Sequence, residues 1–143
     1  MTLILGIDPG VNGAAALIRV EAGIIARCHI GPVILTLPLP AGLIVVEAQH
    51  SSPQQGVRSA FALGQAYGAV RGALAVMPNL KVVYVQPTVW RGSYGLGGGA
   101  AGKAAGIAMA RGILREPERP LTHDKADAVL LAWWGWRNVI QKQ

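Results

Sequence analysis

Short apolar runs separated by turn residues dominate the first third of the chain. The first run, residues 2–8, is rich in Leu and Ile and stops at Pro9-Gly10, which is typical of a buried strand. The next two runs flank a turn at Glu21-Ala22-Gly23, which indicates an antiparallel meander. The predicted strands span residues 2–8, 13–20, 23–30, 43–47 and 81–86.

Helical spacing of apolar residues replaces this pattern after residue 54. The predicted helices span residues 54–76, 103–114 and 122–138, with Thr122 as an N-cap, a short helical turn at 87–91, a glycine-rich stretch at 92–102 and a charged, proline-containing loop at 115–120. Three consecutive strands, then a strand, a helix, a strand and two helices favour an α/β fold with a mixed sheet and helices on its faces. The length of 143 residues fits one domain, 1–143.

One helix carries an unusual glycine stripe. Gly64, Gly68 and Gly72 recur at every fourth position of the helix predicted at 54–76. Glycine weakens a helix, so three on one stripe suggest that another backbone packs closely there. Two interpretations stay open: a helix lying tightly on its own sheet, or a dimer contact.

Composition restricts the class of protein. The apolar fraction of 52% and charged fraction of 14% exclude disorder and suggest extensive burial, including a subunit interface. The net charge of +6 favours a polyanionic partner, of which nucleic acid is the commonest. The single cysteine, Cys28, is interpreted as a small core residue on a strand, because it has no partner for an internal disulfide.

No membrane span or signal peptide is predicted. Residues 28–46 carry no formal charge with His29 taken as neutral, but Pro32, Pro38 and Pro40 interrupt them, which favours strand, loop and strand. The N-terminus lacks a basic segment ahead of its apolar run. We expect a soluble, cytoplasmic protein without a membrane partner, from a bacterial cell or a phage-infected host cell.

Four of the seven acidic residues occur at positions suited to metal binding. Asp8 and Glu47 each end an apolar strand, and Asp124 and Asp127 open the last helix. If the two strands are adjacent and parallel, both side chains emerge at the same end of the sheet, where ligand sites commonly form. A carboxylate cluster in a basic protein suits divalent metal held against phosphate.

Asp127 lies on the apolar stripe of its helix, since Leu130, Leu131 and Trp134 follow at helical spacing. An ionised carboxylate facing the core needs a cation or hydrogen-bond donors. Asp124 is one turn earlier on the same face. The alternative is that Asp124 complements the helix dipole and Asp127 caps a neighbouring backbone.

Together these residues resemble a known family. Ile4-Leu5-Gly6-Ile7-Asp8-Pro9-Gly10 resembles the opening motif of RuvC-type Holliday-junction resolvases, of the RNase H-like superfamily, and Val45-Val46-Glu47 their second acidic motif. Residues 59–69, with the core Leu63-Gly64-Gln65-Ala66, are similar to the family's next helix. Residues 87–103 resemble its basic DNA-contacting segment, and Asp124-Lys125-Ala126-Asp127-Ala128 its terminal acidic motif.

This resemblance implies an RNase H-like sheet of five strands, a three-strand antiparallel meander plus two parallel strands, flanked by helices. It implies a homodimer that resolves four-way and other branched DNA in recombination or repair by paired nicks, with two Mg²⁺ or Mn²⁺ ions per site. By position, Asp8, Glu47, Asp124 and Asp127 would be the metal ligands. Lys103 would contact the scissile phosphate or support transition-state charge, and Arg91 would contact phosphate; the alternative for Lys103 is a solvated lysine. His123 would assist the metal or the water, or lie at the surface.

Two departures from the family pattern concern specificity. The segment between residues 30 and 43 is too short for the helix usual there, which suggests a proline-rich loop and a compact, phage-like member. His50 stands where the family often has an aromatic residue that stacks on an opened base. A weaker stacking residue makes relaxed specificity for several branched DNAs plausible.

Nucleotide binding and DNA binding without cleavage are the alternative functions. Residues 97–104 nearly match a phosphate-binding loop, but Ala104 stands where the magnesium-binding hydroxyl belongs, and no strong strand precedes the loop. The short length disfavours an actin-like or kinase-type nucleotide-binding fold, whose opening motif is similar. The main alternative is a branched-DNA-binding protein with little or no cleavage. Trp133, Trp134 and Trp136 are interpreted as core residues of the last helix, with an exposed member at a subunit contact as the alternative.

Overall fold

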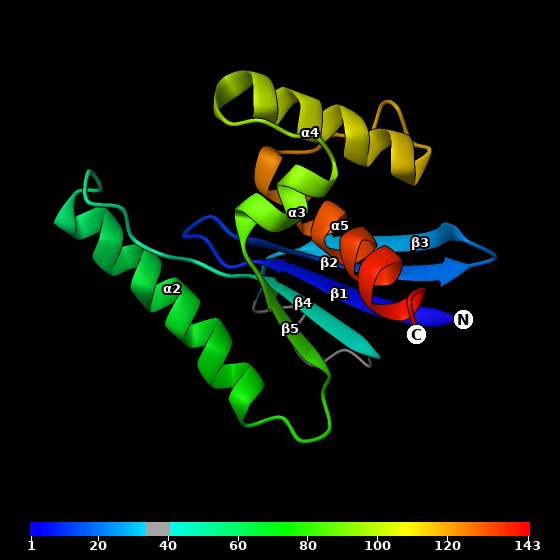
Figure 1. Cartoon of the computed structure of the whole chain (residues 1–143), viewed down its shortest axis with the longest axis horizontal. Helices are drawn as coiled ribbons and strands as arrows, with labels where there is room; N and C mark the ends of the chain where they lie inside the picture. Colours follow the sequence, from blue (N-terminus) through cyan, green and yellow to red (C-terminus); the bar gives the residue numbers. More distant parts are fainter. Residues whose placement is uncertain (34–40) are drawn as a thin grey trace.

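A computed structural model describes residues 1–33 and 41–143. Its five-stranded sheet has the order β3-β2-β1-β4-β5. β1 and β3 pair antiparallel with β2, whereas β4 pairs parallel with both β1 and β5. The strands are β1 Thr2–Asp8, β2 Ala14–Glu21, β3 Ile24–Gly31, β4 Leu43–Glu47 and β5 Val82–Val85. The predicted mixed sheet, an antiparallel meander plus two parallel strands, is confirmed (Figure 1).

The described helices are α2 Val57–Ala75, α3 Pro87–Ser93, α4 Gly99–Leu114 and α5 His123–Gly135, the last continued by a π-helical segment Trp136–Ile140. Two helices begin at residues other than those predicted. α2 begins three residues late, because Gly56 has extended backbone and acts as its N-cap. α4 begins four residues early, inside the glycine-rich stretch, where Ala100 and Ala101 favour the helix.

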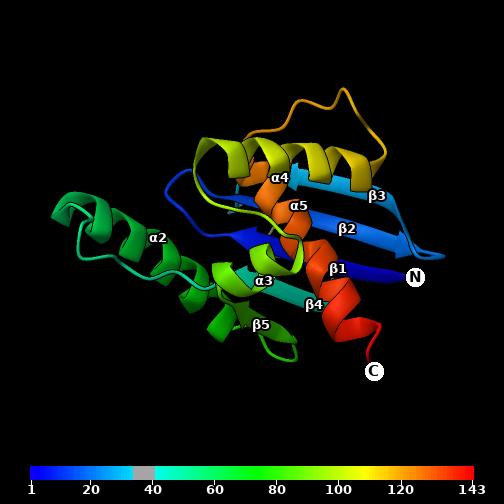
Figure 2. The same cartoon turned by 45° about the horizontal axis from the view of Figure 1, so that its top comes forward.

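The two faces of the sheet are covered unequally. α5 lies directly on one face and α4 packs over α5, which gives the larger core (Figures 1 and 2). The three tryptophans of the last helix pack against this core, and Trp133 stacks on Trp136 with ring centroids 4.5 Å apart, as the core interpretation predicts. On the other face α2 contributes only two fully buried residues, Val70 and Leu74.

α5 approaches β1 and β4 at two glycines. A Cβ at Gly6 would meet the carbonyl oxygen of Ala128 and the amide nitrogen of Ala132, and a Cβ at Gly135 would meet Val45. Real Cβ atoms do not approach other atoms so closely, so glycine is required at both positions. These contacts fix the height and position of α5 above the sheet.

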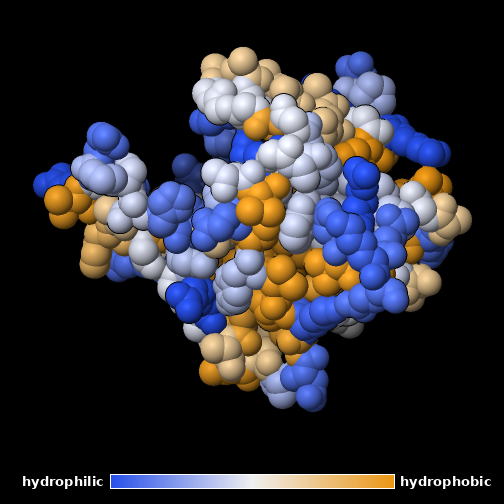
Figure 3. Space-filling view, in the orientation of Figure 1, coloured by the Kyte–Doolittle hydropathy of each residue, from blue (hydrophilic) through white to orange (hydrophobic). Residues whose placement is uncertain are grey.

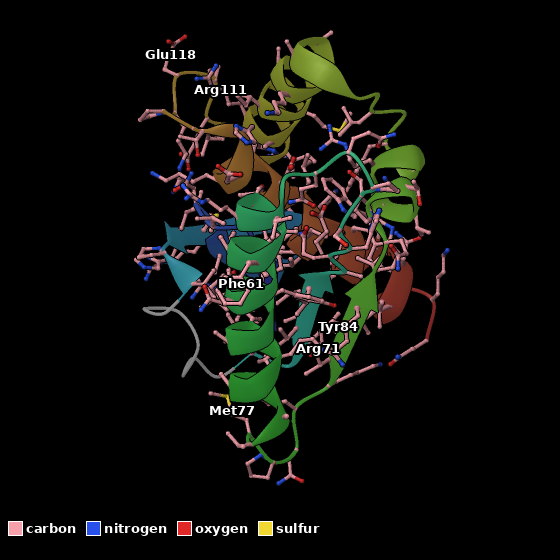
Figure 4. The ribbon with its side chains drawn as sticks, turned by 90° about the vertical axis from the view of Figure 1, so that its left-hand side faces the viewer. Phe61, Arg71, Met77, Tyr84, Arg111 and Glu118 are labelled. Atoms are coloured by element: carbon pink, nitrogen blue, oxygen red, sulfur yellow. The ribbon has the colours of Figure 1, made fainter. Side chains whose placement is uncertain are left out.

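The glycine stripe of α2 does not lie against the sheet. Gly64, Gly68 and Gly72 are all exposed, and a Cβ at each would meet no other atom among the described residues within 4 Å. Of the two interpretations of the stripe, close packing of α2 on the sheet of the described residues is therefore wrong. α2 docks instead through its opposite side, which carries the buried Val70 and Leu74. Beside this contact the guanidinium of Arg71 lies 5.8 Å from the ring centroid of Tyr84 on β5 (Figure 4).

Two other predictions concern the region around the central prolines. The proline-rich loop expected between residues 30 and 43 falls largely on 34–40, outside the described residues. Cys28 lies on β3, half-buried and packed against the larger core, as predicted. Among residues 1–33 and 41–143, no helix is both long and apolar enough to span a membrane.

Candidate active site

Two carboxylates meet at one end of the sheet. Asp8 is the last residue of β1 and Glu47 the last of β4. The strands are adjacent and parallel, with Ile7 opposite Val46, so both acids emerge at the same edge. This is the arrangement that the positions of the acids at the ends of apolar runs predict.

α5 brings the other two acids towards that edge. It begins at His123, capped by the side chain of Thr122, which accepts a hydrogen bond from the Lys125 amide at 3.4 Å. Asp124 and Asp127 occupy its first turns, and the close contact at Gly6 holds the helix over β1. Both charges, together with that of Glu47, raise the pKa of Asp8. The four predicted site acids thus lie within electrostatic range of one another.

Asp8 is the most buried of the four, with 7% of its surface exposed. Burial, followed by the charge of Glu47, raises the pKa of Asp8 from 3.8 to about 7. The hydrogen bond from the Gly10 amide lowers that pKa but does not cancel the rise. That amide donates to Oδ1 of Asp8 at 3.2 Å. A buried carboxylate with one hydrogen bond is under-compensated, so a cation beside it would be favourable.

The guanidinium of Arg91 balances the negative charge of Asp127. Its Nη1 donates to both carboxylate oxygens at 3.2 Å, and its Nη2 donates to the carbonyls of Gly97 and Gly102. Burial raises the pKa of Asp127 to about 6, although the Arg91 charge lowers it. Arg91, predicted as a phosphate contact, therefore points into the cluster and ties the glycine-rich loop to it.

Glu47 is held by two neutral donors. The Gln49 amide donates to Oε1 at 2.8 Å, and the Trp90 indole N–H donates to Oε2 at 2.7 Å. Asp124 pairs with the adjacent His123, with Nε2 and Oδ1 3.1 Å apart. Each acid of the cluster thus has its own partner.

The acids are near one another without forming a closed ligand set. Among the residues that the structure describes, no three His, Cys, Asp or Glu side chains converge on one point as metal ligands would. Carboxylate oxygens are nevertheless the donors that Mg²⁺ and Mn²⁺ prefer, and Asp8 forms no ion pair with a side chain of residues 1–33 or 41–143. By donor chemistry the residues fit a divalent ion.

The remaining predicted residues, Lys103 and His50, are both exposed. Lys103 is exposed near the start of α4. Gly106, one turn further along α4, lies beside Asp127, since a Cβ there would be 3.7 Å from its Oδ1. His50 is exposed beyond Glu47 and lines a small cavity of about 170 Å³ with Gln49, Ser51, Ala60, Leu63, Gly64 and Tyr67.

Three partners were not predicted from the sequence: Trp90 and Gln49 on Glu47, and Arg91 on Asp127. The available signal was the position of Trp90 and Arg91 just after β5. Since β5 is parallel to β4, residues that follow it emerge at the same sheet edge as Glu47.

No family model and no curated protein sequence matches the chain. Solved structures do. The chain resembles a Thermus thermophilus RuvC structure with a TM-score of 0.66 and 21% identity, over 99% of this chain and 97% of that one. It resembles T. thermophilus RuvC in complex with a Holliday junction substrate with a TM-score of 0.65 and 21% identity, over 95% and 96% of the two chains. The chain therefore has the RuvC-type fold.

Proposed function

We propose that this chain, with its RuvC-type fold, is a structure-selective endodeoxyribonuclease that resolves Holliday junctions and other branched DNA by metal-dependent hydrolysis. The observation that carries the proposal is the meeting of Asp8, Glu47 and two carboxylates of α5 at one sheet edge of a chain with net charge +6. A similar structure has been solved with a Holliday junction bound. A basic surface attracts the DNA backbone, and an acidic centre within it holds metal against phosphate.

Asp8, Glu47, Asp124 and Asp127 are the proposed ligands of Mg²⁺ or Mn²⁺. Two such ions would supply an activated water and stabilise the leaving oxygen of the phosphodiester. Asp8 is the central ligand in this proposal, because it is the most buried of the four acids and, after burial, the charges of the other three raise its pKa. Holding four carboxylates together is costly unless a cation joins them.

Basic and aromatic groups around the cluster would hold the DNA. Lys103 is exposed on α4 next to the turn that packs on Asp127, so it is the proposed contact to the scissile phosphate. His50 is the proposed stacking residue for an opened base, since it is exposed just beyond Glu47. Arg91 remains a candidate phosphate contact, although two of its nitrogens already bind within the protein.

The proposed enzyme acts as a homodimer, with α2 as the subunit contact. Only Val70 and Leu74 of this 19-residue helix are fully buried. Its outer side carries the open glycines together with Val57 and Phe61, 86% and 67% exposed. Phe61 is labelled in Figure 4, and hydrophobic surface is visible at the left-hand end of α2 in Figure 3. A stripe without Cβ atoms lets a second helix approach closely, and the exposed apolar side chains would be buried by it.

One observation favours the second candidate, a branched-DNA-binding protein with little or no cleavage. In the described part of the chain Arg91 already binds both carboxylate oxygens of Asp127, and no three acidic or histidine side chains converge on one point. A protein fixed in this arrangement would bind junctions without cutting them.

A junction-cleavage assay tests both candidates. The wild type, D8N and K103A would be mixed with a labelled four-way junction or a linear duplex of the same sequence, with Mg²⁺, Mn²⁺ or EDTA. We expect symmetric nicking of the junction that needs metal, is lost in D8N with binding retained, and is weakened in K103A. Wild-type protein that binds the junction but cuts it with neither metal would refute the nuclease and support the binding protein.

A further inference from the structure

Trp90 is the most enclosed aromatic side chain near the carboxylate cluster. Its relative exposure is 0%, and it lies on α3, which begins directly after β5. The indole Nε1 donates to Oε2 of Glu47 at 2.7 Å. Indole is a donor only, so it neither takes up a proton nor binds a metal ion. Its contribution to Glu47 can therefore only be orientation and hydrogen bonding.

Several contacts keep the indole in one orientation. Tyr94 packs edge-on against the Trp90 ring, with centroids 6.3 Å apart, and its hydroxyl donates to the carbonyl of Leu130 in α5 at 2.9 Å. The guanidinium of Arg91 lies 5.2 Å from the ring centroid on its way to Asp127. The Trp90 indole is thus held between Glu47, the last residue of β4, and Tyr94, whose hydroxyl is bonded to α5.

The hydrogen bond leaves Glu47 free to bind a cation. A carboxylate oxygen has two lone-pair directions, so Oε2 can accept from the indole and still face a metal ion. With Gln49 on Oε1, both oxygens are held from the protein side, which fixes the plane of the carboxylate. Partners of this kind typically change metal affinity by about 10–100-fold when they are removed.

We propose that Trp90 is a positioning residue that orients Glu47 for metal binding. This inference rests on the proposed function, in which Glu47 is a metal ligand. The buried indole donor and its 2.7 Å bond to Oε2 of Glu47 support this role.

W90F tests the inference, because it keeps an aromatic ring and removes the N–H. The matched control is W136F, which changes an indole stacked on Trp133 and close to Gly23, at the turn between β2 and β3. We expect W90F to weaken Mg²⁺ binding, measured by calorimetry, by about 10-fold or more, with W136F near wild type. Cleavage at saturating Mg²⁺ should fall less than cleavage at low Mg²⁺.

The wild type supplies a readout that does not depend on the variant folding. In wild-type protein with ¹⁵N-labelled tryptophan, the Trp90 N–H resonance, assigned through nuclear Overhauser contacts from its indole ring to the ring of Tyr94, should shift on Mg²⁺ titration with the midpoint of metal binding. A Trp90 resonance that stays fixed while Mg²⁺ saturates the protein would refute the positioning role, and so would folded W90F that binds Mg²⁺ like W136F. Wild type that neither binds Mg²⁺ nor cuts a junction would instead overturn the proposed function and this inference with it.

Discussion

Replacing Asp8 by asparagine should stabilise the metal-free protein at pH 8. Asp8 is 7% exposed, and its pKa is raised from 3.8 to about 7, mainly by burial and then by the Glu47 charge. A shift of one pKa unit corresponds to about 1.4 kcal/mol, so ionising Asp8 in the folded protein costs at most about 4 kcal/mol. Asparagine is neutral and its Oδ1 can still accept from the Gly10 amide. We expect D8N to raise the free energy of unfolding at pH 8 by about 2–4 kcal/mol.

The pH dependence gives the sign of the effect. Because the pKa of Asp8 is higher in the folded protein than in the unfolded chain, the folded state holds the proton between about pH 4 and pH 7. The contribution of Asp8 to stability is therefore full below the unfolded pKa of 3.8, declines as pH rises and is lost above about 7. The advantage of D8N should be small near pH 4 and greatest at pH 8.

Urea unfolding in EDTA at pH 4.5 and pH 8 measures this difference. E118Q is the control, since it removes one negative charge from an exposed side chain that forms no ion pair among the described residues. Mg²⁺ added at pH 8 should stabilise the wild type and leave D8N almost unchanged, because a ligand stabilises only the state that binds it. D8N that is less stable than wild type at pH 8, or equally stabilised at both pH values, would contradict the account of Asp8 as an under-compensated buried acid.

Three further substitutions test other parts of the structure. G6A should lower the free energy of unfolding by about 3 kcal/mol or more, and with it the melting temperature, because its Cβ would meet the α5 backbone. G112A, where a Cβ has open space, should melt like wild type. An unchanged melting curve for G6A would be inconsistent with the contact between Gly6 and α5. R91Q should raise the pKa of Asp127 further and move the pH–rate profile for cleavage upwards, with junction affinity at pH 8 unchanged; reduced affinity with an unmoved profile would favour a phosphate contact instead. G68R should convert the proposed dimer to monomer in sedimentation, because the arginine would occupy the open stripe; a dimeric wild type and a dimeric G68R would argue against α2 as the subunit contact.

The sheet and its edge were predictable because strand signals are local. Apolar runs that end in an acid or a Pro-Gly pair define β1 and β4, and the bounds of both agree with the prediction. Parallel pairing of the two then follows from the fold family that the motifs resemble. The position of Asp127 on an apolar stripe likewise predicted a buried carboxylate, and burial does raise its pKa.

The partners of the acids were not predictable in the same way. Trp90 lies 43 residues from Glu47 in sequence, and Arg91 lies 36 from Asp127. No periodicity links residues so far apart; only the parallel pairing of β4 and β5 brings α3 to the site. The glycine stripe of α2 left two interpretations open for a related reason, since a sequence pattern indicates close approach without saying whose backbone approaches; the structure excludes the chain's own sheet and leaves the dimer contact as a proposal.

The dependence of the site on α5 has a consequence for how activity would be acquired during synthesis. Asp8 and Glu47 belong to strands β1 and β4, whereas Asp124 and Asp127 lie on α5, which is synthesised after both strands and packs on β1 at Gly6. A nascent or truncated chain without α5 has only half of the acidic cluster and an uncovered sheet. The acidic cluster is thus complete only after α5 has folded onto β1, and a polypeptide that stops before α5 would present only Asp8 and Glu47 at the sheet edge.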